Sequence, residues 1–436
     1  MKIDPKKMFL HLRSADGESM RKYSTTGFVL LGAGSVGQGV FHQSLLTPNV
    51  DCKVICDVNI NKALALTDPK RRAKIVSSEG EIADALNRNE IAVCQDAELA
   101  AIAPHVEVFF DASTAIDSAP STIESAMISG KHVVMMNAEA DALFGPWFWH
   151  LAQQHNVAYT SSDGDQPAVI ARLVEELRFY GLELVMAGNI KGFLDRYTNP
   201  VKIRPEADKR GLDHQMCSSY TDGTKLCIEM SIVANALGCS VIKAGMMGPQ
   251  MTEAIDMFNY FSFSDIWKSG QEPLVDYILG AKPRGGVYVV GYTDDAYQRR
   301  MLDWFPPEIG PGPFYVLTRP YHLIHLEVMR TIIEVSNTGK SLIAPNFGMR
   351  TEVICYAKND LKEGDILDGP GGFTSYGLIE NRAEDSHTGL PIILSKNAKL
   401  VRAVDKNNRI GWNDVDISSV SSNALEAWRR ASQIDL

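Results

Sequence analysis

Three charged residues recur on one side of a segment that is otherwise apolar. Asp222, Lys225 and Glu229 lie three and four positions apart, which places them on one stripe of an α-helix predicted over residues 221–237. Burying such charges costs free energy unless they pair or meet a ligand. We predict that they are catalytic, together with Lys191, because carboxylates can move protons and ammonium groups can stabilise a developing alkoxide. A structural network of ion pairs is the alternative.

A basic stretch, residues 199–213, precedes that helix. It contains Arg204, Asp208, Lys209 and Arg210. Arginine offers a bidentate fork and lysine a mobile point charge, so the stretch suits a phosphorylated or carboxylated substrate. We predict that Arg204 and Arg210 bind the substrate and that Asp208 and Lys209 take part in catalysis. A solvated charged surface is the alternative.

Two carboxylates flank a glycine at the start of another apolar helix. Asp163 and Asp165 stand on either side of Gly164, and Gln166 follows them. The two carboxylates can turn toward one point, where they would orient a substrate hydroxyl or bind Mg²⁺ or Mn²⁺ through oxygen ligands. We predict that all three polar residues bind the substrate, with Asp163 and Asp165 as the metal ligands. A capped loop with solvated acids is the alternative.

A glycine-rich turn follows the first apolar strand. Gly32, Gly34 and Gly37 fit the pattern GxGxxG, in which they permit a tight turn, close approach of a pyrophosphate and close helix packing. The helix then starts at Ser35 and Val36, with its N-terminus facing the phosphates. Asp57 ends the next predicted strand, near the spacing of ~20 residues expected for an acid that binds the adenosine ribose. The alternative is a glycine turn in a nucleotide-free domain.

The cofactor predicted from this motif is NADH or NADPH. Asp57 favours NADH, because a carboxylate repels the 2′-phosphate of NADPH. The polar residues Asn59, Asn61 and Lys62 follow it and leave NADPH open.

Two loops follow later strands of the same predicted sheet. Ser113 and Thr114 lie in one, and Asn137 and Glu139 lie in the other. Ligands of such sheets bind outside the carboxyl ends of the strands, so we predict that these four residues contact the nicotinamide part of the cofactor. Helix capping and loop solvation are the alternatives.

The elements that must position these residues alternate at first between strands and helices. This pattern predicts a doubly wound parallel sheet of the Rossmann type over residues 1–160. Residues 161–350 read as an α+β catalytic and dimerisation domain, within which the helical stretch 321–335 is expected to return to the first domain. Dense turn signals predict a small β-rich domain over residues 351–436.

Composition narrows the function further. The 436 residues are 45% hydrophobic and carry a net charge of −10, without the basic runs that nucleic-acid binding requires. No apolar window is long enough for a membrane span, and the N-terminus lacks the features of a signal peptide. We therefore expect a cytoplasmic protein that binds a small-molecule substrate and neither nucleic acid nor a membrane. The seven cysteines are expected to be reduced core residues.

Several motifs together resemble a known family. GAGSVGQGV from Gly32, DGDQP from Asp163, DKRGLD from Asp208 and TDGTK from Thr221, followed by Glu229, resemble the homoserine dehydrogenase-like oxidoreductases. Within them they look like the 1-deoxy-D-xylulose 5-phosphate reductoisomerase-like branch. The tail from about Cys355, with AKNDLKEGDILDGPGG, resembles an SAF-type domain. The resemblance implies a homodimer, a nicotinamide cofactor and a substrate pocket between the first two domains.

Three functions are consistent with these residues. The first is NAD(P)H-dependent reduction, with rearrangement, of 1-deoxy-D-xylulose 5-phosphate to 2-C-methyl-D-erythritol 4-phosphate. The second is a dehydrogenase or reductase of an unphosphorylated hydroxy-aldehyde or hydroxy-acid. The third is a non-enzymatic dinucleotide or carbohydrate sensor, which has no need for buried acids and lysines beside its nucleotide crevice. The sequence contains no GxSxG, HExxH or P-loop motif, so it gives no support to a serine hydrolase, a zinc protease or a kinase.

Overall fold

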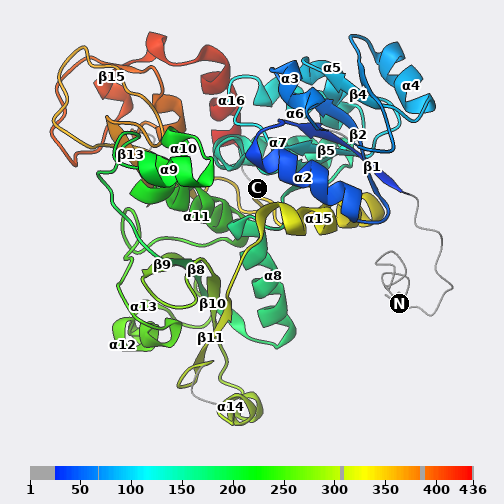
Figure 1. Cartoon of the computed structure of the whole chain (residues 1–436). Helices are drawn as coiled ribbons and strands as arrows, with labels where there is room; N and C mark the ends of the chain where they lie inside the picture. Colours follow the sequence, from blue (N-terminus) through cyan, green and yellow to red (C-terminus); the bar gives the residue numbers. More distant parts are fainter. Residues whose placement is uncertain (1–24, 67, 305–308, 383–387, 435–436) are drawn as a thin grey trace. The chain divides into compact units, whose positions relative to one another are not determined.

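The computed structural model describes residues 25–66, 68–304, 309–382 and 388–434. The chain divides into two compact units that are discontinuous in sequence (Figure 1). Unit 1 comprises the residues up to Asn137, Leu151–Gly164 and Leu323–Ser341, and unit 2 comprises Ala138–His150, Asp165–His322 and the residues from Leu342 onward. Helix α7 (Ala138–His155) contributes residues to both.

Unit 1 is built on a seven-stranded sheet with the order β3-β4-β2-β1-β5-β6-β7. Every neighbouring pair is parallel, which confirms the predicted doubly wound Rossmann sheet. The strands read as nearly continuous apolar runs because both faces of such a sheet are covered. Their bounds are β1 Thr26–Leu31, β2 Val50–Cys56, β3 Ala73–Ile75, β4 Ile91–Cys94, β5 Val108–Asp111, β6 His132–Met135 and β7 Tyr159–Ser161.

The helices of unit 1 complete its core. They are α2 Ser35–Leu46, α3 Ile60–Leu64, α4 Glu79–Asn87, α5 Ala97–Ala101, α6 Ala119–Ile128 and α15 Ile324–Thr338. Helix α15 packs beside α2 (yellow and blue in Figure 1), and its Val328 and Ile332 join Phe28 and Phe110 in one apolar cluster. The expected return of residues 321–335 to the first domain is therefore confirmed.

Unit 2 contains a four-stranded mixed sheet with the order β11-β10-β8-β9. Strands β8 and β9 are parallel, whereas β10 is antiparallel to both β8 and β11. Helix α8 packs against this sheet, and an aromatic cluster around Phe261, Phe263 and Trp267 packs with its residues. The elements are α8 Gln166–Phe179, β8 Glu183–Lys191, η2 Ala254–Asp256, α12 Met257–Tyr260, α13 Phe263–Ile266, β9 Leu274–Leu279, β10 Val287–Tyr292, α14 Ala296–Leu302 and β11 Phe314–Arg319.

Helix α11 (Thr224–Leu237) runs through the middle of unit 2. It packs against α8, β8 and β9, and also against β12 and β13 of the C-terminal part. All residues from Thr224 to Ala236 are buried, as the nearly all-apolar sequence predicted, and Gly238 ends the helix in the left-handed conformation. The predicted start at residue 221 is corrected, because Gly223 has a φ of +88° and separates α10 (His214–Asp222) from α11. Helix α9 (Arg204–Arg210) precedes both.

The C-terminal part of unit 2 is rich in short β elements, as predicted. Strands β12 and β13 form an antiparallel pair, and β14 and β15 form another. The elements are β12 Thr351–Ala357, β13 Ser375–Asn381, η4 Ile392–Ser395, β14 Lys399–Leu400, η5 Trp412–Asp414, β15 Val415–Asp416, η6 Ile417–Ser419 and α16 Ser422–Ser432.

Two further expectations concern the chain as a whole. All seven cysteines are buried and form no disulfide, as predicted for reduced core residues. Among the helices that the structure describes, none combines the length and the apolar composition needed to cross a membrane.

Candidate active site

The glycine turn of unit 1 has the geometry that a dinucleotide requires. Gly32 has a φ of +95°, and a Cβ atom built on it would lie 2.8 Å from the backbone carbonyl of Ala112. A Cβ atom on Gly37 would lie 1.9 Å from the Gly32 carbonyl oxygen, so both positions demand glycine. Around Gly34 a Cβ atom would meet nothing within 4 Å. The open side of the turn is therefore where a pyrophosphate would approach.

Asp57 lies directly beside this turn. Its Oδ2 accepts the Ala33 N–H at 2.7 Å and its Oδ1 accepts the Asn59 N–H at 2.8 Å. Helix α2 begins after Gly34 without a side-chain cap, and Ser35 is exposed while Val36 is half-buried. Backbone N–H groups of the first turn are thus available for a phosphate. These residues fit a bound NADH or NADPH, with Asp57 at the ribose.

The loops after β5 and β6 are tied to one buried carboxylate. Asp111 is 1% exposed, and its Oδ1 accepts the Ser113 N–H at 2.8 Å. Asn137 donates from Nδ2 to the Ala115 carbonyl at 2.8 Å, whereas Thr114 is exposed. Burial raises the pKa of Asp111, although hydrogen bonds from Ser113 and Asn137 oppose this. Asp111 was not among the predicted site residues, although an acid at the carboxyl end of a buried strand is a usable signal.

Lys225 forms an ion pair with Glu139, a residue that was predicted from the sequence to contact the cofactor. Its Nζ contacts both carboxylate oxygens of Glu139 at 3.1 Å, and the two side chains are 8% and 14% exposed. Both residues belong to unit 2. Burial alone would lower the pKa of Lys225, but the nearby carboxylates of Glu139 and Asp165 outweigh burial and raise it. The ion pair with Glu139 therefore favours the charged form of Lys225.

Glu229 lies one helical turn further along α11 and is also buried. Burial and the neighbouring Asp165 raise its pKa to about 8, against the opposing effect of Lys191 and Lys225. Its Oε2 has no hydrogen-bond partner in the described part of the chain. Burial lowers the pKa of Lys191, against Glu229, which raises it. Two lysines, Lys191 and Lys225, thus interact with three acids, Glu139, Asp165 and Glu229, in one cluster.

A polar chain adjoins this cluster at the start of α8. Asp165 caps the helix, with its Oδ1 accepting the Gln166 N–H at 3.0 Å, and burial raises its pKa. Gln166 lies 3.1 Å from the ring Nε2 of His322 and accepts a short hydrogen bond from Asn189. The Oδ1 of Asn189 is buried and lacks a partner among the described residues. Asn189 and His322 were not among the predicted site residues. Each is an isolated polar residue, within a strand or before a helix, and no sequence pattern marks such a residue as part of a site.

Other predicted catalytic residues lie elsewhere in unit 2. Asp222 is the last residue of α10 and pairs with Lys358 at 2.8 Å, so the predicted single stripe with Lys225 and Glu229 is wrong. The cause is the break at Gly223, which a pattern of charges does not reveal.

The predicted phosphate-binding stretch forms α9. Asp208 contacts His214 at 2.6 Å and Arg204 at 3.5 Å, and all three side chains are well exposed. Lys209 is also exposed, and the backbone of Arg210 ends the helix. Asp208 contacts Arg204 and His214 rather than the Lys225 cluster, which is the pattern of a solvated surface.

The two carboxylates predicted as metal ligands belong to different units. Asp163 lies in unit 1, where its Oδ2 accepts a hydrogen bond from Thr331 at 3.0 Å. Asp165 lies in unit 2, near Lys225 and His322. Within the described ranges, no group of three His, Cys, Asp or Glu side chains has an arrangement that could hold a metal ion. The Mg²⁺ or Mn²⁺ site stays a prediction without a ligand set.

One family matches part of the chain. Residues 164–328 match the family described as "Oxidoreductase DRL, catalytic domain", and this segment contains Lys191, Lys225 and Glu229. The match supports the oxidoreductase class. The match does not support the narrower resemblance to homoserine dehydrogenases or reductoisomerases. The tail that resembles an SAF-type domain lies outside the matched residues. A search of curated proteins found no match.

Solved structures give more distant similarities. The chain resembles a "probable dehydrogenase" from Thermotoga maritima, with 12% identity, a TM-score of 0.41 and coverage of 72% of this chain and 90% of the other. It also resembles a myo-inositol dehydrogenase from Corynebacterium glutamicum, with 10% identity, a TM-score of 0.41 and coverage of 72% and 89%. These similarities are too remote to bear on function.

Proposed function

We propose that the chain is an NAD(P)-dependent oxidoreductase that interconverts a hydroxyl and a carbonyl group on a small polar substrate. One observation carries this proposal. The segment that matches an oxidoreductase catalytic domain contains Lys191, Lys225 and Glu229, which interact electrostatically in one cluster. The glycine turn beside Asp57 supports the choice of cofactor.

Two residues of unit 2, Lys225 and Glu229, have different roles in the proposed reaction. The dinucleotide, when bound at Gly34 and Asp57, supplies or accepts the hydride. Lys225 stabilises negative charge on the substrate oxygen, because its charge is fixed by Glu139 and its surroundings are water-poor. Glu229 exchanges a proton with the substrate, because its pKa of about 8 lies near the working pH of most enzymes.

An unphosphorylated hydroxy-aldehyde or hydroxy-acid is the leading substrate class. The open acceptors, Asn189 Oδ1 and Glu229 Oε2, suit the hydroxyl donors of such a compound. Of the cations in the stretch predicted to suit a phosphate, Arg204 and Lys209 are instead on the exposed surface of α9.

Reductive isomerisation of 1-deoxy-D-xylulose 5-phosphate is the second candidate. A specific observation favours it, because hydride transfer alone needs fewer groups than the two lysines and two acids that interact around Glu229. Rearrangement of a ketose phosphate also requires stabilisation of an enediolate-like or retro-aldol intermediate.

A single assay tests both candidates. The purified full chain is incubated with NADH or NADPH and with free and phosphorylated sugars, aldehydes and hydroxy-acids, with and without Mg²⁺ or Mn²⁺. Nicotinamide absorbance is followed, and products are identified by mass and NMR. Turnover of unphosphorylated compounds alone supports the leading candidate, and turnover of the ketose phosphate to the branched polyol phosphate supports the second. Tight dinucleotide binding without turnover of any compound would favour a sensor. The homodimer expected from the sequence is tested by sedimentation of the same preparation.

A further inference from the structure

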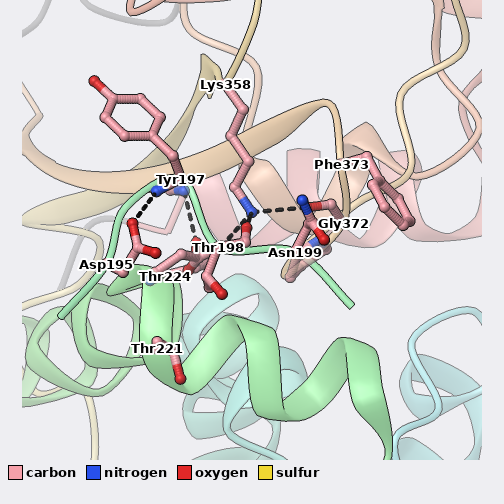
Figure 2. A network of polar contacts seen from close by, with 12 residues as sticks. Asp195, Tyr197, Thr198, Asn199, Thr221, Thr224, Lys358, Gly372 and Phe373 are labelled. Carbon is pink, nitrogen blue, oxygen red and sulfur yellow. Dashed lines mark hydrogen bonds and ion pairs between the residues drawn. The ribbon is translucent and has the colours of Figure 1, made fainter. Parts of the chain in front are cut away.

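Lys358 is a buried lysine outside the segment that matches the oxidoreductase family. It follows β12 in the C-terminal part of unit 2 and is 2% exposed. Its Nζ donates to the carbonyl oxygens of Thr198 at 2.9 Å and Gly372 at 2.7 Å (Figure 2). It also forms an ion pair with Asp222 Oδ2 at 2.8 Å. An ammonium group has three N–H donors. Lys358 is therefore held by two hydrogen bonds to backbone carbonyls and by one ion pair.

The three acceptors come from three different segments of unit 2. Thr198 lies in the loop 195–199, Asp222 ends α10, and Gly372 lies in a turn before β13. The loop is itself bound to α10, since the Asp195 N–H donates to the Thr221 carbonyl at 2.9 Å. Lys358 thus contacts the loop, the end of α10 and the C-terminal turn with one ammonium group.

Asp222 connects Lys358 to the start of α11. Its Oδ1 accepts the N–H of Thr224, the first residue of α11, at 2.8 Å. The hydroxyl of Thr224 accepts the Gly377 N–H of β13 at 2.8 Å. Gly223, at the N-cap, has no side chain that could perform this capping. The first turn of α11 is therefore held by Asp222 and by the C-terminal part, and the next residue is Lys225.

We propose that Lys358 is a positioning residue for Lys225, acting through Asp222 and Thr224. The inference rests on the proposed function, in which Lys225 contacts the substrate oxygen. The C-terminal part of unit 2 is then a working component of the catalytic unit, because it fixes the backbone from which the catalytic lysine projects.

The test compares Lys358→Met with a matched control in the full chain. Trp428→Phe removes another buried hydrogen bond of the C-terminal part, from the indole Nε1 to Glu352 at 2.6 Å, without touching the α10–α11 junction. Hydrogen exchange is measured at the backbone amides of residues 224–229, together with kcat, KM and dinucleotide affinity. The kcat value is expressed per folded molecule, so that a loss of folded protein does not count as a loss of activity.

We expect Lys358→Met to lower kcat by about tenfold or more, because a small misplacement of a catalytic group has effects of this size. Exchange at Thr224 and Lys225 should accelerate, and dinucleotide affinity should stay unchanged. Trp428→Phe should change neither kcat nor this exchange. The proposal would be overturned if Lys358→Met showed the same kcat and the same exchange rates as Trp428→Phe.

A second variant covers the case in which Lys358→Met does not fold. Asp222→Asn combined with Lys358→Met leaves no unpaired buried charge and should fold. It should still show a lowered kcat, because Lys358 no longer joins the C-terminal turn to the loop and to α10. An unchanged kcat in this folded variant would also overturn the proposal. Absence of oxidoreductase turnover in the wild type would instead contradict the proposed function, while the exchange comparison would still decide the positioning role.

Discussion

Two buried lysines of unit 2 meet carboxylates in different ways. Lys358 donates hydrogen bonds to backbone carbonyls of two segments and forms an ion pair with a carboxylate of a third. The hydrogen bonds of Lys225 go to the two oxygens of one carboxylate, Glu139. An ammonium group bound to three segments restrains the fold, whereas one bound to a single carboxylate can turn a donor toward a substrate oxygen. We therefore propose that a lysine–carboxylate pair serves structure at one site and chemistry at the other.

Removal of the structural lysine should have the largest effect on stability. Lys358→Met leaves the carboxylate of Asp222 buried without its partner, which typically costs about 3–5 kcal/mol of unfolding free energy. Denaturant unfolding should show this loss. The combined Asp222→Asn and Lys358→Met variant should recover most of it, and equal instability of the single and double variants would contradict the assignment.

Removal of the catalytic lysine should affect turnover more than stability. Lys225→Met should lower kcat by about 10²–10³-fold, because it removes a preorganised charge from the developing oxyanion. The unfolding free energy should fall less than in Lys358→Met, since Glu139 is partly solvated. Steady-state kinetics and denaturant unfolding test whether Lys225→Met loses more kcat, and Lys358→Met more unfolding free energy. A fully active or an unfolded Lys225→Met protein would assign Lys225 to structure.

Glu229 predicts a pH dependence. The unfolded chain loses this proton near the ordinary pKa of 4.5 and the folded chain near 8, so the folded state binds more protons between these values. The unfolding free energy should therefore be largest below pH 4.5 for this group and should decline as the pH rises toward 8. Glu229→Gln should remove this decline, remove the ionisation near pH 8 from the kcat profile, and lower kcat by about 10²-fold. Identical profiles for variant and wild type would exclude Glu229 as the titrating group.

Asp57 should have the smallest effect, on the choice between cofactors. Asp57→Ala should change the ratio of NADH to NADPH affinity by about tenfold, because one charge-assisted hydrogen bond to the ribose is lost and the 2′-phosphate is no longer repelled. Titration of each dinucleotide against variant and wild type measures this ratio. Equal ratios would remove Asp57 from the ribose site.

These sites also differ in how far the sequence predicts them. The glycine turn and Asp57 are encoded by local spacing, and the burial of α11 follows from its nearly all-apolar composition. The pairing of Asp222 with Lys358 joins segments far apart in sequence, so no local pattern contains it. The predicted stripe failed because one glycine in a left-handed conformation ends α10 before α11 begins. Asn189 escaped prediction because its role depends on Gln166 from another element.

The central claim is that Lys225 assists hydride transfer to or from a bound nicotinamide cofactor. Single-turnover kinetics test it most directly, with wild type and Lys225→Met both saturated with the dinucleotide and mixed with a substrate found in the assay above. The account predicts equal dinucleotide affinity and a hydride-transfer rate that is about 10²–10³-fold slower in the variant. An equal rate in the two proteins, with the dinucleotide bound to both, would contradict it.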